Sequence, residues 1–268
     1  MNNDCVLNER GPSWHRVVLN AGATQNKLSP EMVDHLLAAL EACEADPTAR
    51  ALLIEGSGGH FSSGMDLAAA ATERAVKGSG GERFMQLLRR MTDSSVVVVS
   101  VVDGKASGGG VGLAAASDYV FATPRSQFSL PEILWGLVPC LIAPFLIRRI
   151  GFQACQRMTL STLPIGADAA LACGLVDAVG DQALAQLLQR LRMVAPEGIG
   201  RAKRYFSKLA LINDAMLDLA QHELEQILAA PDVSARLQEF ALSRRYPWES
   251  LPERRLPSGD LRSQEVSQ

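Results

Sequence analysis

The sequence predicts an α/β fold in which short buried strands alternate with helices. Two observations support this prediction: apolar, β-branched runs of strand length, and amphipathic or alanine-rich stretches of helix length between them. The strand runs lie at residues 15–19, 51–55, 96–102 and 118–122. Strands separated by helical stretches favour right-handed crossovers and a largely parallel sheet covered by helices.

The composition is that of an ordinary globular protein and disfavours several functional classes. The 268 residues are 47% hydrophobic and 21% charged, and 26 basic against 29 acidic residues give a formal net charge of −3. Nucleic acid is a poor candidate partner because its recognition needs a basic face. No run approaches the roughly 18 apolar residues of a membrane helix, and the first 20 residues lack the apolar core of a signal peptide. We therefore expect a cytoplasmic protein without a membrane span.

Cysteine and histidine are too scattered to predict a metal site or a disulfide framework. The five cysteines are odd in number and form no C-x-x-C pair, and only four histidines are present. We expect no metal ion.

The first predicted unit is β-α-β. After the strand at 15–19, residues 26–46 have apolar positions at spacings of three and four, which is typical of a helix. Ser29 is the expected N-cap, with Pro30 at the first helical position. The strand at 51–55 is apolar without alternation, which indicates burial on both faces.

The remaining elements follow in order. A loop at 56–64 precedes a helix at 82–91, and an alanine-rich helix ending near residue 116 follows the strand at 96–102. From residue 150 the pattern is helical, with stretches at 153–160, 167–172, 182–192 and 197–228. We expect a core at 1–195, a helical C-terminal region at 196–248 and, from its charge, serine and proline content, a disordered tail at 249–268.

Three segments contain the candidate chemistry. They are FSSGMDL at 61–67, GKASGGGVGL at 104–113 and FSLPEILWGLVP at 128–139. The glycine triplet between a buried strand and a helix leaves backbone N–H groups at a helix N-terminus, which is where an oxyanion hole can form. A tight strand–helix crossing explains the glycines equally well. A dinucleotide fingerprint at 110–115 is disfavoured because the helix is short and no acidic residue ends a second strand.

Four side chains in or near these segments each allow two interpretations, one functional and one structural. Glu132 lies among apolar neighbours, so partial desolvation would raise its pKa toward neutrality, but a carboxylate after Pro131 can also serve a helix N-terminus. Asp66 is either a catalytic carboxylate or a helix cap. His60 is either catalytic or a loop histidine. Arg148 either pairs with a substrate carboxylate or belongs to a solvated helix end.

Taken together, the order and spacing of the three segments resemble the enoyl-CoA hydratase/isomerase (crotonase) superfamily. That family has F-[SA]-x-G-x-D, G-x-x-x-G-G-G and P-E-x-x-x-G segments in this order, and the match extends over about residues 14–180. The resemblance implies a crotonase-like spiral of β-β-α turns with a C-terminal helical trimerisation region. It also implies homotrimers or dimers of trimers, and a thioester carbonyl bound by two backbone amides, here those of Met65 and Gly109.

At one position the sequence departs from the pattern of typical hydratases, which narrows the activity that the resemblance implies. Typical hydratases carry a second glutamate two residues after the glycine triplet, where this chain has Gly112. Stretches at 128–140, 144–151 and 158–165, with a terminal YPWE at 246–249, look like the dehydratases of polyketide β-branching. These lyases of antibiotic biosynthesis dehydrate a 3-hydroxy-3-methylglutaryl group on an acyl carrier protein. No separate cofactor is implied, because the phosphopantetheine or CoA thioester enters as part of the substrate.

The resemblance also assigns roles to single residues. Asp66 and Glu132 correspond to the acid/base pair, and Gly112 is expected to leave room for the branched acyl group. Trp135, Cys140 and Arg148 are expected at the substrate pocket. Two alternatives stay open: an enoyl or dienoyl isomerase or hydratase that uses CoA, and a catalytically silent homologue that binds a carrier protein.

Overall fold

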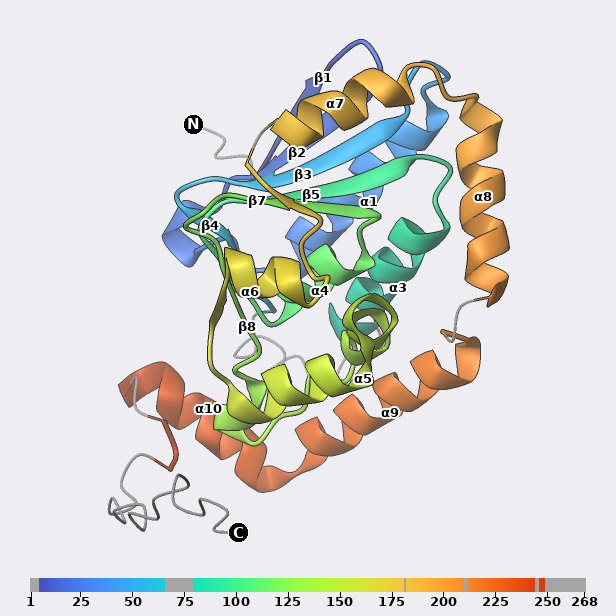
Figure 1. Ribbon diagram of the computed structural model, residues 1–268. Helices are drawn as coiled ribbons and strands as arrows, with labels where there is room; N and C mark the ends of the chain where they lie inside the picture. Colours follow the sequence, from blue (N-terminus) through green and yellow to red (C-terminus); the bar gives the residue numbers. More distant parts are fainter. Residues whose placement is uncertain (1–4, 66–79, 181, 210–211, 244–245, 249–268) are drawn as a thin grey trace, which may run out of the picture.

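The computed structural model describes residues 5–65, 80–180, 182–209, 212–243 and 246–248, which form a mixed α/β fold built on two sheets. The larger sheet has six strands in the order β1-β2-β3-β5-β7-β10 (Figure 1). They are β1 (Val6–Arg10), β2 (Trp14–Leu19), β3 (Ala51–Gly56), β5 (Val97–Val102), β7 (Tyr119–Ala122) and β10 (Ala178–Val179). Only the β1–β2 pair is antiparallel, so the predicted parallel sheet is confirmed.

A second, four-stranded sheet was not expected from the sequence. Its order is β4-β6-β8-β9, with β4 (His60–Ser62), β6 (Lys105–Ser107), β8 (Gln127–Ser129) and β9 (Ile165–Gly166). Strands of two or three residues are too short to give a hydrophobic period. Three times along the chain, at β3–β4, β5–β6 and β7–β8, a strand of the large sheet is followed by one of the small sheet, and the next described element is a helix or helical turn. This repetition is the expected spiral of β-β-α turns.

Helices cover both faces of the large sheet. On one face the main apolar core packs against α1 (Pro30–Ala45), α3 (Gly80–Asp93) and α4 (Gly109–Ala116). On the other face α7 (Gln182–Leu191) packs against β3, β5 and β7 (Figure 1). The central strand β3 is buried on both faces, as its unbroken apolar sequence predicts.

The first helix begins at Pro30, where Ser29 Oγ accepts a hydrogen bond from the Met32 amide at 3.2 Å. The expected cap is therefore confirmed, whereas the expected start at residue 26 is wrong. Asn26 is fully buried with φ of 53°, and its side chain donates to the carbonyl oxygens of Ser57 and His60. These hydrogen bonds hold the loop before α1 against the segment that leads into β4, and residue 26 is therefore not part of the helix.

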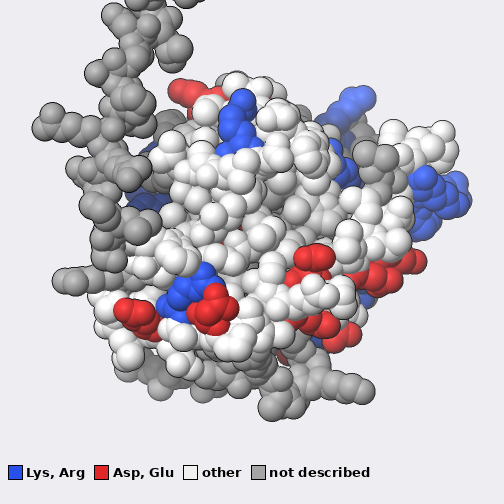
Figure 2. All heavy atoms as spheres, turned by 90° about the horizontal axis from the view of Figure 1, so that it is seen from below, with Lys and Arg blue, Asp and Glu red and all other residues white. Residues whose placement is uncertain are grey.

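The described residues of the C-terminal half form five further helices, and the expected stretch at 197–228 divides into two of them. The five are α5 (Ala143–Ser161), α6 (Ala167–Ala172), α8 (Pro196–Leu209), α9 (Asp214–Ala229) and α10 (Pro231–Ser243). A new N-cap begins α9, because Asn213 Oδ1 accepts from the Met216 amide. Figure 2 shows the face from below, with acidic and basic side chains among uncharged ones; the exposed charged residues of α9 and α10 include Asp218, Glu223, Glu225 and Glu239. No helix in the described part of the chain is long and apolar enough to cross a membrane. The tail at 249–268 lies outside the described residues.

Close backbone contact joins the small sheet to α4. A methyl group added at Gly110 would lie 2.6 Å from the carbonyl oxygen of Ser62, and one added at Gly64 would lie 2.7 Å from that of Ser107. Backbone atoms cannot rotate away as side chains do, so these glycines set how closely β4, β6 and α4 approach.

We therefore expect Gly110→Ala to lower the free energy of unfolding by about 1–3 kcal/mol, the usual cost of overpacking. Urea denaturation of the purified variant measures the change. Gly198→Ala is the matched control, because the nearest atom to an added methyl there, the Ala195 Cβ, is 3.9 Å away in α8. Equal stability of Gly110→Ala and wild type would contradict the packing account.

Candidate active site

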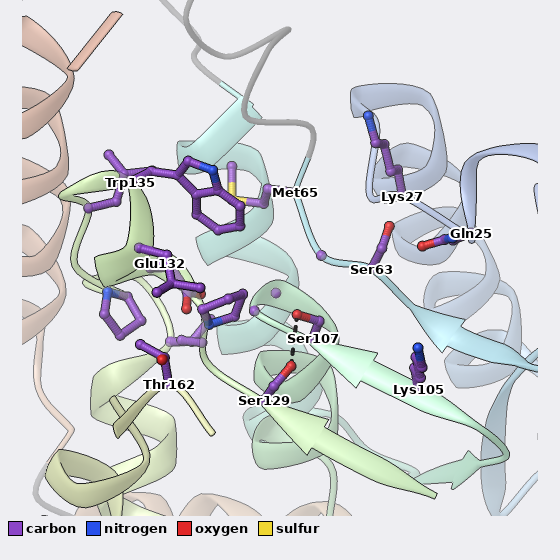
Figure 3. Close-up of a pocket in the computed structure, with 18 of the residues that line it drawn as sticks. Gln25, Lys27, Ser63, Met65, Lys105, Ser107, Ser129, Glu132, Trp135 and Thr162 are labelled. Atoms are coloured by element: carbon purple, nitrogen blue, oxygen red, sulfur yellow. Dashed lines mark hydrogen bonds between the residues drawn. The ribbon is translucent and has the colours of Figure 1, made fainter. Parts of the chain in front are cut away.

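A cavity of about 970 Å³ opens where β4, β6 and β8 end (Figure 3). Because these strands are parallel, their carboxyl ends meet at one edge of the small sheet. The segments that follow them, 63–65, 107–109 and 131–132, all line the cavity. The C-terminal helices supply part of the opposite wall with Leu224, Leu228, Leu237 and Phe240.

Two backbone amides, those of Met65 and Gly109, lie close together, one in the segment after β4 and one at the start of α4. The position of a Cβ on Gly109 is 3.3 Å from the Met65 nitrogen, so the two segments lie in contact. Neither amide has a hydrogen-bond partner among the described residues. Gly109 is also the first residue of α4, where the helix dipole favours negative charge. The pair can therefore bind an oxygen atom that acquires negative charge.

Glu132 begins the 3₁₀ turn η2 (Glu132–Trp135) directly after Pro131. Its carboxyl group lies over Gly108, since a Cβ there would be 2.9 Å from Glu132 Oε1. The other oxygen, Oε2, is buried and has no hydrogen-bond partner among the described residues. Burial raises the pKa of Glu132 to about 7. A carboxyl group with this pKa can both give and take a proton near neutral pH.

Trp135 and Cys140, which we expected at the substrate pocket, both line this cavity. The Trp135 ring packs edge to face on Phe240 of α10, with 5.2 Å between ring centroids, and its buried Nε1 has no acceptor in the described part of the chain. Burial raises the pKa of the Cys140 thiol to about 11, so it is neutral at physiological pH. The wall beyond Glu132 is thus largely apolar.

Two other predictions for the substrate pocket are wrong. A Cβ at Gly112 would lie 2.3 Å from Cγ2 of Ile142, so the space beside this glycine belongs to a packed side chain and leaves no room for substrate. Arg148 lines a separate small pocket between α3, α5 and α9, and one of its nitrogens lies 3.4 Å from the Ala115 carbonyl oxygen. The surroundings of Gly112 and Arg148 could not be predicted from the sequence, because both depend on contacts between residues far apart in the chain.

The candidate carboxylate Asp66 lies outside the described residues, immediately after Met65. His60, on β4, also lines the cavity.

Sequence reasoning missed a polar face formed by β6 and β8. Four of the residues that line the cavity come from it: Lys105, Ser107, Gln127 and Ser129. The alternation of polar and apolar residues at 105–107 and 127–129 was the available signal, although each run has only three residues.

Three residues that could bind a metal ion lie just before β1 and on α1, and none of them lines this cavity. Cys5, Glu31 and His35 bring one ligand atom each to within 4.8 Å of one another. No pattern in the sequence links these three residues, and the expectation of no metal ion stays a prediction.

Comparisons with known proteins identify relatives over most of the chain. The model of the enoyl-CoA hydratase/isomerase family matches residues 13–242. The bacillaene synthase dehydratase PksH of Bacillus subtilis is 30% identical over 88% of this chain and 92% of its own. The enoyl-CoA hydratase EchA19 of Mycobacterium tuberculosis is 28% identical over 73% of this chain and 76% of its own.

Solved structures show the same fold. The crystal structure of PksH from Bacillus subtilis superposes with a TM-score of 0.85 at 27% identity, covering 92% of this chain and all (100%) of the other. AtuE of Pseudomonas aeruginosa superposes with a TM-score of 0.72 at 30% identity, again over 92% and 100% of the two chains.

The raised pKa of Glu132 predicts a stability that falls as pH rises. The unfolded chain gives up this proton near pH 4.5, whereas the folded protein keeps it until about pH 7. Wild type should lose up to about 3 kcal/mol of unfolding free energy from this group across that window, since one pKa unit is about 1.4 kcal/mol. Glu132→Gln has no such proton to lose, so its unfolding free energy should not fall for this reason. The unfolding free energy of Glu132→Gln minus that of wild type should therefore increase with pH.

Urea denaturation at pH 5 and pH 8 tests this prediction. Glu239→Gln, at an exposed position of α10, is the control. If the difference in unfolding free energy between wild type and Glu132→Gln were the same at both pH values, the prediction would be refuted.

Proposed function

Because this chain belongs to the enoyl-CoA hydratase/isomerase family, we propose that it dehydrates a 3-hydroxy-3-methylglutaryl thioester carried by an acyl carrier protein. The products are the 3-methylglutaconyl thioester and water. The main support is the buried Glu132 carboxyl beside two amides that have no hydrogen-bond partner among the described residues. Similarity to the PksH dehydratase over most of the chain supports dehydration and the polyketide context.

In this proposal the thioester oxygen binds to the amides of Met65 and Gly109. Removal of the C2 proton moves negative charge onto that oxygen, and fixed N–H donors stabilise this charge more strongly than that of the ground state. One such donor typically contributes about 10²- to 10³-fold in rate.

The elimination needs two proton transfers. One carboxyl group removes the C2 proton, and another protonates the C3 hydroxyl as it leaves as water. We assign Glu132 and Asp66 to these two roles. A pKa of about 7 suits Glu132 to the task, because proton transfer is most efficient when the pKa lies near the working pH.

The cavity walls fit a branched acyl group on a long arm. The apolar wall around Trp135 and Leu137 can receive the 3-methyl group. The phosphopantetheine arm would leave the cavity past Gln25, Lys27 and Ser63, which lie together at its mouth in Figure 3.

We also propose that the chain assembles as a homotrimer or a dimer of trimers. Large apolar side chains are exposed on α5 and α8, including Phe152 at 61% and Phe206 at 66%. Such exposure marks protein interfaces. Light scattering should give the mass of three or six chains, and the mass of one chain would contradict the proposal.

Mass spectrometry tests the reaction. A carrier protein loaded with the 3-hydroxy-3-methylglutaryl group should lose the mass of one water when incubated with wild type. Glu132→Gln should lower this rate by about 10²- to 10⁴-fold, the usual contribution of a general acid or base. Glu239→Gln should keep the wild-type rate.

An intact carrier substrate after incubation with wild type would overturn the proposed reaction. Full activity of Glu132→Gln would overturn the role of Glu132 alone. The same acyl group on CoA, run in parallel, measures the preference for the carrier protein.

A further inference from the structure

The two short strands β6 and β8 present a polar face to the cavity. They pair in register, Lys105 with Gln127 and Ser107 with Ser129. Between these pairs, Ala106 and Phe128 are 1% and 0% exposed. Because side chains alternate along a strand, the four polar residues share the face opposite the core. All four line the cavity.

The two serines form a directed hydrogen bond. Ser129 Oγ donates to Ser107 Oγ at 3.1 Å, as the dashed line in Figure 3 shows. A hydroxyl group carries one proton, so this bond uses the proton of Ser129 and leaves that of Ser107 for another acceptor. No such acceptor is present among the described residues. The Ser107 hydroxyl is therefore a donor available to a ligand in the cavity.

A positive charge lies on the same face, two residues earlier on β6. The Lys105 side chain lines the cavity and has no ion-pair partner in the described part of the chain. An ammonium group with three N–H donors and a hydroxyl donor together suit an anion. The opposite wall, around Trp135 and Leu137, is largely apolar and could not hold a charged group without a large desolvation cost.

The spacing fits an acyl group that ends in a carboxylate. Ser107 is two residues before Gly109, so their Cα atoms are at most about 7 Å apart. In a glutaryl chain four carbon–carbon bonds of about 1.5 Å each separate the thioester carbon from the distal carboxylate carbon, about 5 Å when extended. An acyl group with its carbonyl at the Gly109 amide can thus reach the serine pair.

We propose that Lys105, Ser107 and Ser129 form a subsite for the distal carboxylate of the acyl substrate. In this subsite Ser129 orients the Ser107 hydroxyl, which donates to one carboxylate oxygen, and Lys105 neutralises the charge. The inference rests on the proposed function and adds a selection for dicarboxylic over monocarboxylic acyl groups.

Paired substrates test it. We would measure kcat/KM for the 3-hydroxy-3-methylglutaryl thioester and for the 3-hydroxy-3-methylbutyryl thioester, which lacks only the carboxylate. Each is attached to pantetheine and, in a second series, to phosphopantetheine. Wild type should prefer the glutaryl substrate about 10- to 100-fold, as expected for hydrogen bonds to a charged group.

The variants should remove this preference without removing activity. Lys105→Gln and Ser107→Ala should each lower kcat/KM for the glutaryl substrate by about tenfold or more while leaving the butyryl substrate within about twofold. Lys105→Arg keeps the charge and should keep most of the preference. Arg10→Gln, on an exposed part of β1, is the control outside the cavity. Activity on the butyryl substrate shows that each variant is folded.

Three results would overturn the subsite: no glutaryl preference in wild type, an equal loss on both acyl groups in the variants, or a loss that appears only in the phosphopantetheine series. The last result would assign Lys105 to the arm's phosphate instead. Wild type that dehydrates neither these substrates nor the loaded carrier protein would refute the proposed reaction itself, which separates the two failures.

Discussion

The arrangement of the site depends on the contact between backbones where the strands of the small sheet end. At Gly64, Gly108 and Gly110 a side chain would collide with a carbonyl oxygen, an amide or the Glu132 carboxyl. The glycines allow three segments distant in sequence to approach within van der Waals distance. That approach brings the Met65 and Gly109 amides together and holds Glu132 beside them. The large sheet and its helices serve as the rigid support on which this contact is built.

The cavity at these strand ends has a polar side and an apolar side. Alternation along β6 and β8 sends Ala106 and Phe128 into the core and polar side chains into the cavity. The helices α9 and α10 add the apolar part from the far end of the chain. Glu132 lines the same cavity, and burial of its carboxyl group raises its pKa. The packing that encloses the cavity therefore also adjusts the acidity of this carboxyl group.

Much of the fold could be predicted from the sequence because its large elements are long and strongly patterned. Ser29 and Pro30 mark the start of α1, and the β-branched run at 97–102 is β5. The small sheet was missed because strands of three residues carry no period. In the candidate site, motif spacing indicated Glu132 and the glycine triplet. Gly112 and Arg148 were misjudged because their surroundings come from α5 and other distant segments, which no local pattern encodes.

The packing of Ile142 against Gly112 also constrains how this site can change during evolution. Any side chain at position 112 meets a branched neighbour from another segment, so a carboxylate cannot be introduced there in one step. Position 142 has to become smaller first, and that change by itself opens a void in the core. Positions 112 and 142 are therefore coupled by epistasis: each single change is unfavourable, and only the two changes together allow a carboxylate two residues after the glycine triplet.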